Sequence, residues 1–367
     1  MIEFFDLRRS HDPLRSSFHN VLDRVIDSSE YVLGSTVNEF ETDFANFCQS
    51  KFCIGTNSGT SALHLALEAC GVSAGDEVIT TPMTFIATSA AISYLGAIPV
   101  FVDVDPLTWN IDPDKIEAAI TPRTKAIMPV HLHGLMADMP KIMKIAKAHN
   151  LKVVEDSAQS HGAAIDGIIS SGFGDASGYS FYPGKNLGAL GEAGAVVTNS
   201  EEISDRVRLM RNWGSPARYV HAEVAFNYRM EGIQGGFLNV KLPHMKKWTA
   251  ERIAIARKYT DGLTQYGIQC PSVPKGFEHV FHVFAILSQN RETLTKNFAL
   301  RKIGSGVHYP IPVHLQAAYK NLGHNVGSFP VAERLASSFF SLPIFPGMTE
   351  EEIDLVIKTV VDTEKPE

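Results

Sequence analysis

One lysine of this chain, Lys185, lies in surroundings unlike those of an ordinary surface lysine. Apolar and aromatic residues 181–183 precede it, and four glycines lie close by: Gly184, Gly188, Gly191 and Gly194. Such a setting partly desolvates the amine, which lowers its pKa and makes it a better nucleophile toward a carbonyl carbon. Glycines also let the backbone approach a flat ligand closely. Taken alone, a solvated loop lysine is the common alternative, so the interpretation depends on the rest of the chain.

An acidic pair, Glu155-Asp156, ends the short, mainly apolar segment at 151–154. This pattern predicts a buried parallel strand whose carboxyl end meets a site. Asp156 could pair there with the protonated pyridinium nitrogen of a cofactor and so keep the cofactor ring electron-withdrawing. Alternatively, it could cap the next helix. Gln159 could reach a phenolic oxygen on the same cofactor ring. His161 could either contact the site or pack in the core.

Two earlier segments offer further binding groups. A strand at 52–56 leads into a helical pattern through four small residues: Ser58, Gly59, Thr60 and Ser61. Their hydroxyls and N–H groups would lie at the positive end of the helix dipole and could cradle a phosphate, although no Gly-Lys-Ser/Thr ends the turn as in a P-loop. Phe85 follows a strand at 77–81 and could stack on an aromatic cofactor. Taken singly, these features equally fit a helix cap and a core phenylalanine.

Four candidate groups follow one another along the chain, each after a strand: the phosphate cradle at 58–61, Phe85, Asp156 and Lys185. In this the chain resembles the fold-type I pyridoxal-phosphate enzymes, and more narrowly it is similar to the DegT/DnrJ/EryC1/StrS family of sugar aminotransferases. The resemblance extends from 31–34 to 308–310, and its most specific motifs are 155–162 and 180–186. It implies pyridoxal 5'-phosphate as cofactor, with pyridoxamine phosphate as the intermediate form.

The resemblance also implies roles for individual residues. Lys185 would form a Schiff base with the cofactor aldehyde and then act as general base, while Asp156 would keep the ring nitrogen protonated. Thr60, Ser61 and Ser180 would anchor the phosphate.

A second set of implied roles concerns the segment 227–234. Asn227 would reach across a homodimer interface to the phosphate of the neighbouring subunit, and Arg229 would lie near the substrate. From the residues alone, this segment would be a polar loop before a helix that begins at about residue 231.

The segments 306–316 and 235–242 look like the branch of the family that acts at C3 of the sugar. His308 and Tyr309 could hydrogen-bond the sugar or its pyrophosphate, or form a strand end that packs on Phe339 and Phe340. We therefore expect a dTDP-linked 3-keto-6-deoxyhexose as substrate, and the family resemblance implies L-glutamate as amino donor and a role in surface polysaccharide or glycoside biosynthesis. A UDP-linked 3-keto-N-acetylhexosaminuronate and a 4-keto sugar are the alternatives.

Composition limits the other classes of protein. The chain has 367 residues, 44% of them hydrophobic, and a net charge of −7 without basic clusters, so nucleic acid is not an expected partner. Its four cysteines show neither metal-ligand nor disulfide spacing. No signal peptide is recognisable, and no apolar run approaches the ~20 residues that span a bilayer. A cytoplasmic enzyme without a metal ion is expected.

Alternating patterns predict an α/β fold with a mostly parallel sheet; the resemblance implies seven strands, one of them antiparallel. We expect a large cofactor-binding domain at 1–245 and a small α+β domain at 246–367, joined within a linking helix at 238–248. Strands are predicted at 52–56, 77–81, 98–102, 125–130, 152–156, 176–181 and 194–198, and in the small domain near 279–287 and 305–309. Helical patterns lie at 61–71, 84–95, 113–120 and 138–149.

Four other functions fit the sequence less well. A dehydratase of the same fold would carry histidine in place of Lys185, and a non-catalytic regulator would tolerate the loss of Lys185 or Asp156. A nicotinamide dehydrogenase is only weakly suggested by 172–178, where the third glycine of the fingerprint is missing. A metal hydrolase could use three histidines, for which packing and loop roles are the simpler interpretation: His131, His133 and His161.

Overall fold

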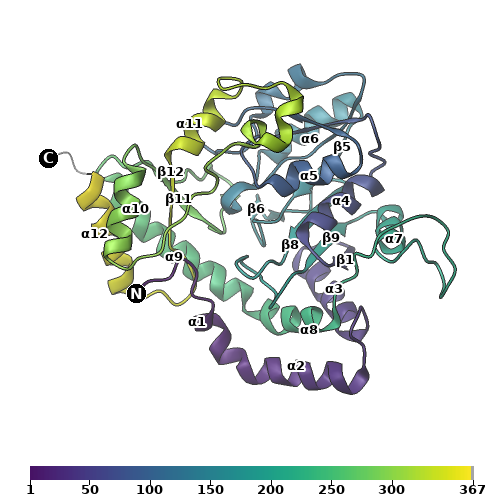
Figure 1. Ribbon diagram of the computed structural model, residues 1–367. Helices are drawn as coiled ribbons and strands as arrows, with labels where there is room; N and C mark the ends of the chain where they lie inside the picture. Colours follow the sequence, from purple (N-terminus) through teal and green to yellow (C-terminus); the bar gives the residue numbers. More distant parts are fainter. Residues whose placement is uncertain (365–367) are drawn as a thin grey trace.

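The computed structural model describes residues 1–364, and its centre is a seven-stranded sheet in the order β1-β9-β8-β5-β4-β2-β3 (Figure 1). Six strands are parallel to one another, and β9 is antiparallel to both of its neighbours. This arrangement confirms the predicted sheet. The strands are β1 (Phe52–Thr56), β2 (Glu77–Thr80), β3 (Ile98–Phe101), β4 (Thr124–Ile127), β5 (Lys152–Asp156), β8 (Ala176–Ser180) and β9 (Gly194–Thr198).

Alternate residues of the strands enter two separate cores, because successive side chains of a strand point to opposite faces. Val154 and Val196 pack on one face of the sheet, whereas Val153 and Val197 pack on the other. The first face is covered by α4 (Gly59–Ala69), α5 (Ile86–Tyr94) and α7 (Glu201–Met210). The second is covered by α3 (Ser35–Phe47), α6 (Met139–His149) and α8 (Gly232–Lys241). Burial on both faces explains why these strands read as short apolar runs.

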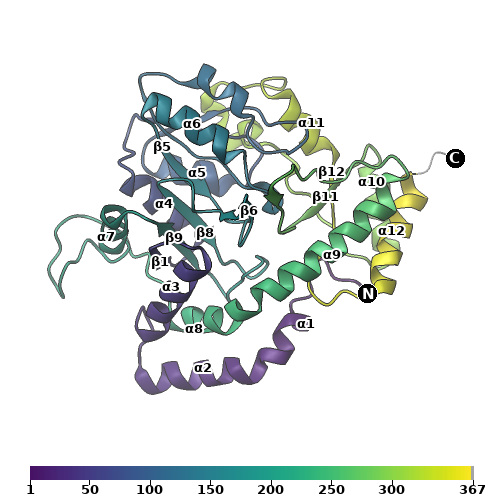
Figure 2. The ribbon, with the colours of Figure 1, turned by 180° about the vertical axis from the view of Figure 1, so that it is seen from behind.

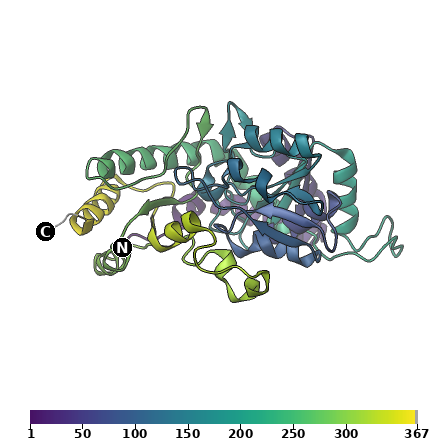
Figure 3. The ribbon, with the colours of Figure 1, turned by 90° about the horizontal axis from the view of Figure 1, so that it is seen from above.

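A smaller lobe lies at one end of the sheet, together with the N-terminus (Figures 1 and 3). After α8, a 3-10 turn η5 (Leu242–His244) that contains Pro243 leads into the long helix α9 (Met245–Thr264), which runs out to this lobe (Figure 2). The lobe has its own apolar core. Its other elements are β11 (Phe284–Leu287), α10 (Arg291–Leu300), β12 (Phe339–Leu342) and α12 (Glu350–Glu364).

Two segments join this lobe to the rest of the molecule. The first comprises η6 (Val313–Leu315), η7 (Ala317–Leu322) and α11 (Pro330–Ser338), which share a core with Met83, Phe101 and Trp109. The second is the N-terminal segment, which comprises α1 (Arg8–His11), η1 (Asp12–Leu14) and α2 (Arg15–Ser28). In Figure 2, α1 lies beneath α9 and α2 runs beneath α8. Arg9 of this segment pairs with Glu352 of α12 at 2.5 Å.

The local predictions were wrong in three places. The linking helix expected at 238–248 is interrupted by η5, where Pro243 lacks the N–H group that a continuous α-helix needs. The expected helix at 113–120 is a pair of 3-10 turns, η2 (Pro113–Lys115) and η3 (Glu117–Ala119). The expected strand at 305–309 forms only an isolated bridge from Gly306 to Ser341, because a ladder depends on pairing with a distant segment, and this segment contacts its partner in strand geometry at one residue only. The partner of β11 is β12 instead.

The remaining short elements are η4 (Leu132–Gly134) and a small sheet of β6 (Ala164–Ile165), β7 (Ile168–Ile169) and β10 (Phe277–Glu278). Within residues 1–364, no helix combines the length and the apolar character that crossing a membrane requires.

Candidate active site

A cavity of about 510 Å³ lies at the carboxyl ends of parallel strands, where ligands bind in open α/β sheets. Most of the predicted site residues line it, although they come from segments far apart in the chain. The structure thus brings together the predicted phosphate-binding turn, the ring of Phe85, the carboxylate of Asp156 and the amine of Lys185. Those that line the cavity are Ser58, Gly59, Thr60, Phe85, Asp156, Gln159, Ser180, Lys185, His308 and Tyr309.

Asp156, the last residue of β5, is 5% exposed and fixed by two donors. Thr88 of α5 donates its hydroxyl to Oδ2 at 2.7 Å, and the Ala158 N–H donates to Oδ1 at 3.1 Å. Burial raises the pKa of Asp156, and these hydrogen bonds together with the charge of Lys185 only partly offset that effect. Such a carboxylate favours a cationic partner.

Lys185 follows β8 and reaches the same cavity. Burial lowers its pKa to about 8, although attraction to Asp156 acts in the opposite direction. About a tenth of this amine is therefore unprotonated at pH 7, far more than for an ordinary lysine, and the unprotonated amine is the state that attacks a carbonyl. The desolvation predicted from the neighbouring residues is thus present.

Gln159 is held with its amide nitrogen toward Tyr309. Its Oε1 accepts the His133 N–H at 2.7 Å, and its Nε2 donates to the Tyr309 hydroxyl at 3.2 Å. The backbone donor at His133 assigns the amide orientation, because an N–H cannot face the NH₂ group. The result is a hydrogen-bond donor at the cavity wall.

The predicted phosphate cradle is the first turn of α4. Ser58 caps this helix by accepting the Ser61 N–H at 3.1 Å. The Ser61 hydroxyl is engaged within the cap, donating to Asn57 Oδ1 at 2.6 Å, and Ser61 does not line the cavity. The N–H groups of Gly59 and Thr60 have no preceding helical carbonyl, so they and the Thr60 hydroxyl are the anion-binding groups of this turn.

Aromatic rings enclose the cavity near these groups. Phe85, which is 55% exposed, lies 5.7 Å from Tyr309 between ring centroids, with the planes tilted by 40°. A flat ligand could stack on the open face of Phe85. On the cradle side, a Cβ at Gly59 would lie 2.5 Å from Cβ of Ser180, so this close approach requires glycine.

Asn227 and Arg229 lie outside the cavity of their own chain. Asn227 is exposed, and its Oδ1 accepts a hydrogen bond from Arg229 Nε at 2.9 Å. Arg229 forms an isolated bridge with Thr56 of β1. A role for either residue in catalysis would therefore need a second subunit.

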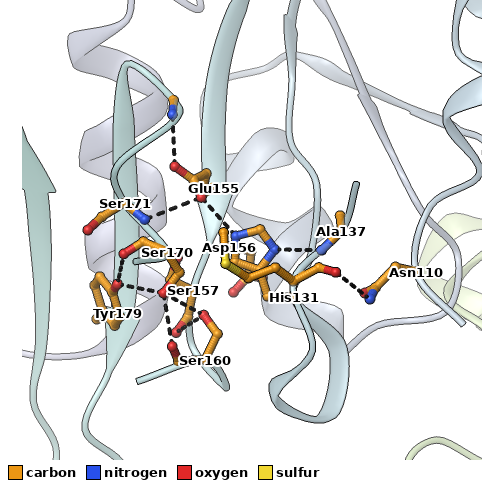
Figure 4. Close-up of polar contacts among 12 residues, drawn as sticks. Asn110, His131, Ala137, Glu155, Asp156, Ser157, Ser160, Ser170, Ser171 and Tyr179 are labelled. Carbon is orange, nitrogen blue, oxygen red and sulfur yellow. Dashed lines mark hydrogen bonds and ion pairs between the residues drawn. The ribbon is translucent and has the colours of Figure 1, made fainter. Parts of the chain in front are cut away.

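The three histidines considered for a metal site have other surroundings. His131 bonds Glu155 at 2.9 Å in a buried network (Figure 4), and His133 Nε2 lies 2.9 Å from the His308 carbonyl. His161 is buried among Phe44, Tyr179 and Phe181. Residues 1–364 contain no group of three or more His, Cys, Asp or Glu side chains placed to hold a metal ion.

Several residues of the site were not singled out in the sequence. Thr88 could have been found, because it follows Phe85 by one helical turn and so faces the same side. Phe5 and His282 come from distant segments that no local pattern connects with the site, whereas Tyr182 and Glu192 lie near Lys185 in the chain.

The residues present fit pyridoxal phosphate. The first turn of α4 and Ser180 would hold its phosphate, Phe85 would stack on its ring, and Asp156 would face its ring nitrogen. When bound, this group supplies an electron sink for charge that develops on a substrate carbon.

Fold and site together define a pyridoxal-phosphate aminotransferase. The sequence model of the "DegT/DnrJ/EryC1/StrS aminotransferase family" matches residues 13–361, and the chain belongs to this family. A structure described as S. venezuelae DesV in complex with a ketimine intermediate superposes with a TM-score of 0.97, at 39% identity and with 100% and 99% of the two chains covered.

Three curated relatives show the range of names among similar proteins. A "dTDP-3-amino-3,6-dideoxy-alpha-D-galactopyranose transaminase" of Aneurinibacillus thermoaerophilus is 43% identical, covering 98% of this chain and 99% of the relative. A "UDP-N-acetyl-3-dehydro-alpha-D-glucosamine 3-aminotranferase" of Acidithiobacillus ferrooxidans is 42% identical, covering 96% and 95%. A "Pleiotropic regulatory protein" of Geobacillus stearothermophilus is also 42% identical, covering 98% of each chain.

Proposed function

We propose that this nucleotide-sugar aminotransferase acts at C3 of a dTDP-linked 3-keto-6-deoxyhexose, with L-glutamate as amino donor. The observation that carries the proposal is one cavity that joins Lys185 and Asp156 to His308 and Tyr309. The relatives named as dTDP-3-amino sugar transaminases support the dTDP sugar and the C3 position. The product would serve surface polysaccharide or glycoside biosynthesis.

In this reaction Lys185 has the proton-transfer role. Its lowered pKa lets the amine take a proton from the substrate carbon and return it. Asp156 is held by Thr88 and Ala158 so that its charge faces the cavity. His308, whose Nδ1 is 2.9 Å from the Ser341 hydroxyl, and Tyr309 would bind the sugar or its pyrophosphate.

The substrate proposal is tested by incubating the protein with L-glutamate and a panel of 3-keto and 4-keto nucleotide sugars. Mass analysis should detect the amino sugar from the dTDP-linked 3-keto-6-deoxyhexose, and Lys185→Ala is the inactive control. Product only from a 4-keto sugar would overturn the C3 assignment. Preference for a UDP-linked 3-keto-N-acetylhexosaminuronate would overturn the dTDP assignment, and the UDP-sugar relative makes it the main rival.

A homodimer with shared active sites is part of the proposal. Asn227 is exposed and outside its own cavity, which is compatible with its reaching the cofactor phosphate of a partner subunit and with Arg229 reaching the substrate there. Mixing Lys185→Ala with Asn227→Ala chains should then restore activity, because one site of each hybrid dimer would be fully wild type. An active monomer would contradict this proposal.

A regulatory function is the second candidate, because one relative is named as a regulatory protein. A non-catalytic regulator would not need an amine of lowered pKa facing a buried carboxylate. Turnover in the substrate panel would favour the enzyme. We also propose a cytoplasmic location, which cell fractionation would test.

A further inference from the structure

The first residues of the chain pack against the small lobe. Ile2 donates its N–H to the Lys302 carbonyl at 2.9 Å and accepts the Gly304 N–H at 2.7 Å, forming a parallel bridge. Its side chain is buried in the core of that lobe. A Cβ at Gly304 would lie 2.4 Å from the nitrogen of Phe4, so the close contact requires glycine. The segment 2–6 is therefore held in a defined place.

Phe5 brings this segment to the cavity. Its ring is half-buried, lines the cavity and stacks on His282, with 6.2 Å between centroids and 9° between planes. Phe4 supports it from 4.4 Å and itself stacks on His308 at 5.5 Å. A Cβ built on Gly184 would lie 3.6 Å from Phe5, so the ring lies close to the backbone beside Lys185. An apolar face therefore borders the cavity close to Gly184.

His282 is a buried polar group without an assigned role. It is 7% exposed and lines the cavity, and its Nδ1 has no hydrogen-bond partner within residues 1–364. Burial, and then the positive charges of Lys185 and Arg252, hold the pKa of His282 well below its usual value. The imidazole is thus neutral and offers one donor and one acceptor.

Phe5 and His282 offer a ligand different chemical groups from those of the phosphate cradle. The cradle offers N–H groups at a helix N-terminus, which suit an anion. Phe5 and His282 offer an aromatic face and a neutral nitrogen, which suit a ligand with C–H groups and uncharged hydroxyls.

We propose that Phe5 and His282 bind the hexose of the nucleotide sugar: Phe5 packs against its apolar face, and His282 hydrogen-bonds one of its hydroxyls. This inference rests on the proposed function and adds two specificity-determining residues to it. It also makes the N-terminal segment 2–6 part of the active site, although this segment lies 180 residues before Lys185 in the chain.

The test uses the holoenzyme and separates the two half-reactions. The cofactor bound as its aldehyde form absorbs visible light. Single-turnover measurements follow the loss of this absorbance band with L-glutamate, and then its return with the keto nucleotide sugar. The variants are Phe5→Ala and His282→Phe, of which the second keeps a ring that can stack on Phe5. Phe277→Ala is the matched control, because Phe277 is also half-buried but does not line the cavity. Affinity for the nucleoside diphosphate alone is measured in parallel.

We expect both variants to raise the half-saturating concentration of keto sugar about tenfold, since one net hydrogen bond or a comparable apolar contact contributes about that factor. The donor half-reaction and the nucleotide affinity should match those of the wild type and of Phe277→Ala. An unchanged sugar half-reaction, or equal losses in both halves, would overturn the inference. If wild-type protein completes the donor half-reaction but no keto sugar restores the band, the proposed function fails, and the inference fails with it.

Discussion

His131 donates from Nε2 to Glu155 at 2.9 Å, and neither side chain is exposed (Figure 4). The ring orientation is assigned by its other nitrogen, because Nδ1 accepts the Ala137 N–H at 3.2 Å and so carries no proton. Glu155 also accepts the N–H groups of Gly174 and Ser171. Burial alone would raise the pKa of Glu155, but these donors bring it below its usual value. An ionised carboxylate thus lies one residue before Asp156.

His131→Phe should destabilise the protein strongly, because it leaves a buried charge without its side-chain partner. We expect the free energy of unfolding to fall by about 3 kcal/mol, measured by urea denaturation. His149→Phe is the matched control, since His149 and Glu117 form a pair at 3.1 Å that is largely exposed and should contribute little. Equal effects of the two substitutions would contradict this account of the network.

Thr88→Val should shift the acid limb of the pH–rate profile upward. Thr88 donates to Asp156, and this bond lowers a carboxyl pKa that burial has raised. Without the donor, the pKa rises further and Asp156 becomes protonated at a higher pH, so activity at mildly acidic pH falls first. Thr88→Ser, which keeps a hydroxyl, should restore the wild-type profile. A profile unchanged in Thr88→Val would show that the bond does not tune Asp156.

Gly194→Ala should weaken cofactor binding. A Cβ at this position would lie 2.2 Å from the Ser58 carbonyl oxygen and 2.7 Å from the Gly59 nitrogen, so β9 and the first turn of α4 must separate. We expect a loss in cofactor affinity of about tenfold or more, measured by absorbance titration of the apoprotein. Gly262→Ala is the control, because its Cβ would meet only the flexible Ile357 side chain. Wild-type affinity in Gly194→Ala would contradict the proposed cradle.

Lys241 should make stability depend on pH on the alkaline side. It is 3% exposed, and its amine contacts the Gly188 carbonyl at 2.5 Å and His11 Nε2 at 2.8 Å. Burial lowers the pKa of Lys241 to about 7. Between about pH 7 and the ordinary lysine value of about 10.4, Lys241 is protonated in the unfolded chain but mostly neutral in the folded one. The unfolded state therefore binds more protons, and the free energy of unfolding rises with pH through that window.

Lys241→Met removes this dependence. The stability of the wild type relative to Lys241→Met should rise by about 3 kcal/mol between pH 7 and 9.5, measured by urea denaturation at both values. A relative stability that stays constant or falls would contradict a buried amine of lowered pKa.

The sequence predicted the sheet well because its strands are buried on both faces and end in turn residues. It also identified Lys185 and Asp156 as cavity residues from their local surroundings. The expected strand at 305–309 failed because its pairing depends on β12, which lies more than thirty residues away. Neighbouring residues decide a local pattern, whereas tertiary contacts decide which distant segments pair.

The same reason explains which site residues were missed. Phe5 and His282 come to the cavity only through the packing of the N-terminal segment on the small lobe. Ser61 was expected at the phosphate, but its hydroxyl is used within the helix cap. A serine at this position can either cap the helix or bind a phosphate, and the sequence alone does not show which of the two it does.

The most direct test of the central claim is to reduce the holoenzyme with borohydride and locate the modification by peptide mass spectrometry. The account predicts that the cofactor mass is attached to the peptide containing Lys185, and that this product is absent in Lys185→Ala. Attachment to a different lysine, or full turnover by Lys185→Ala, would contradict it.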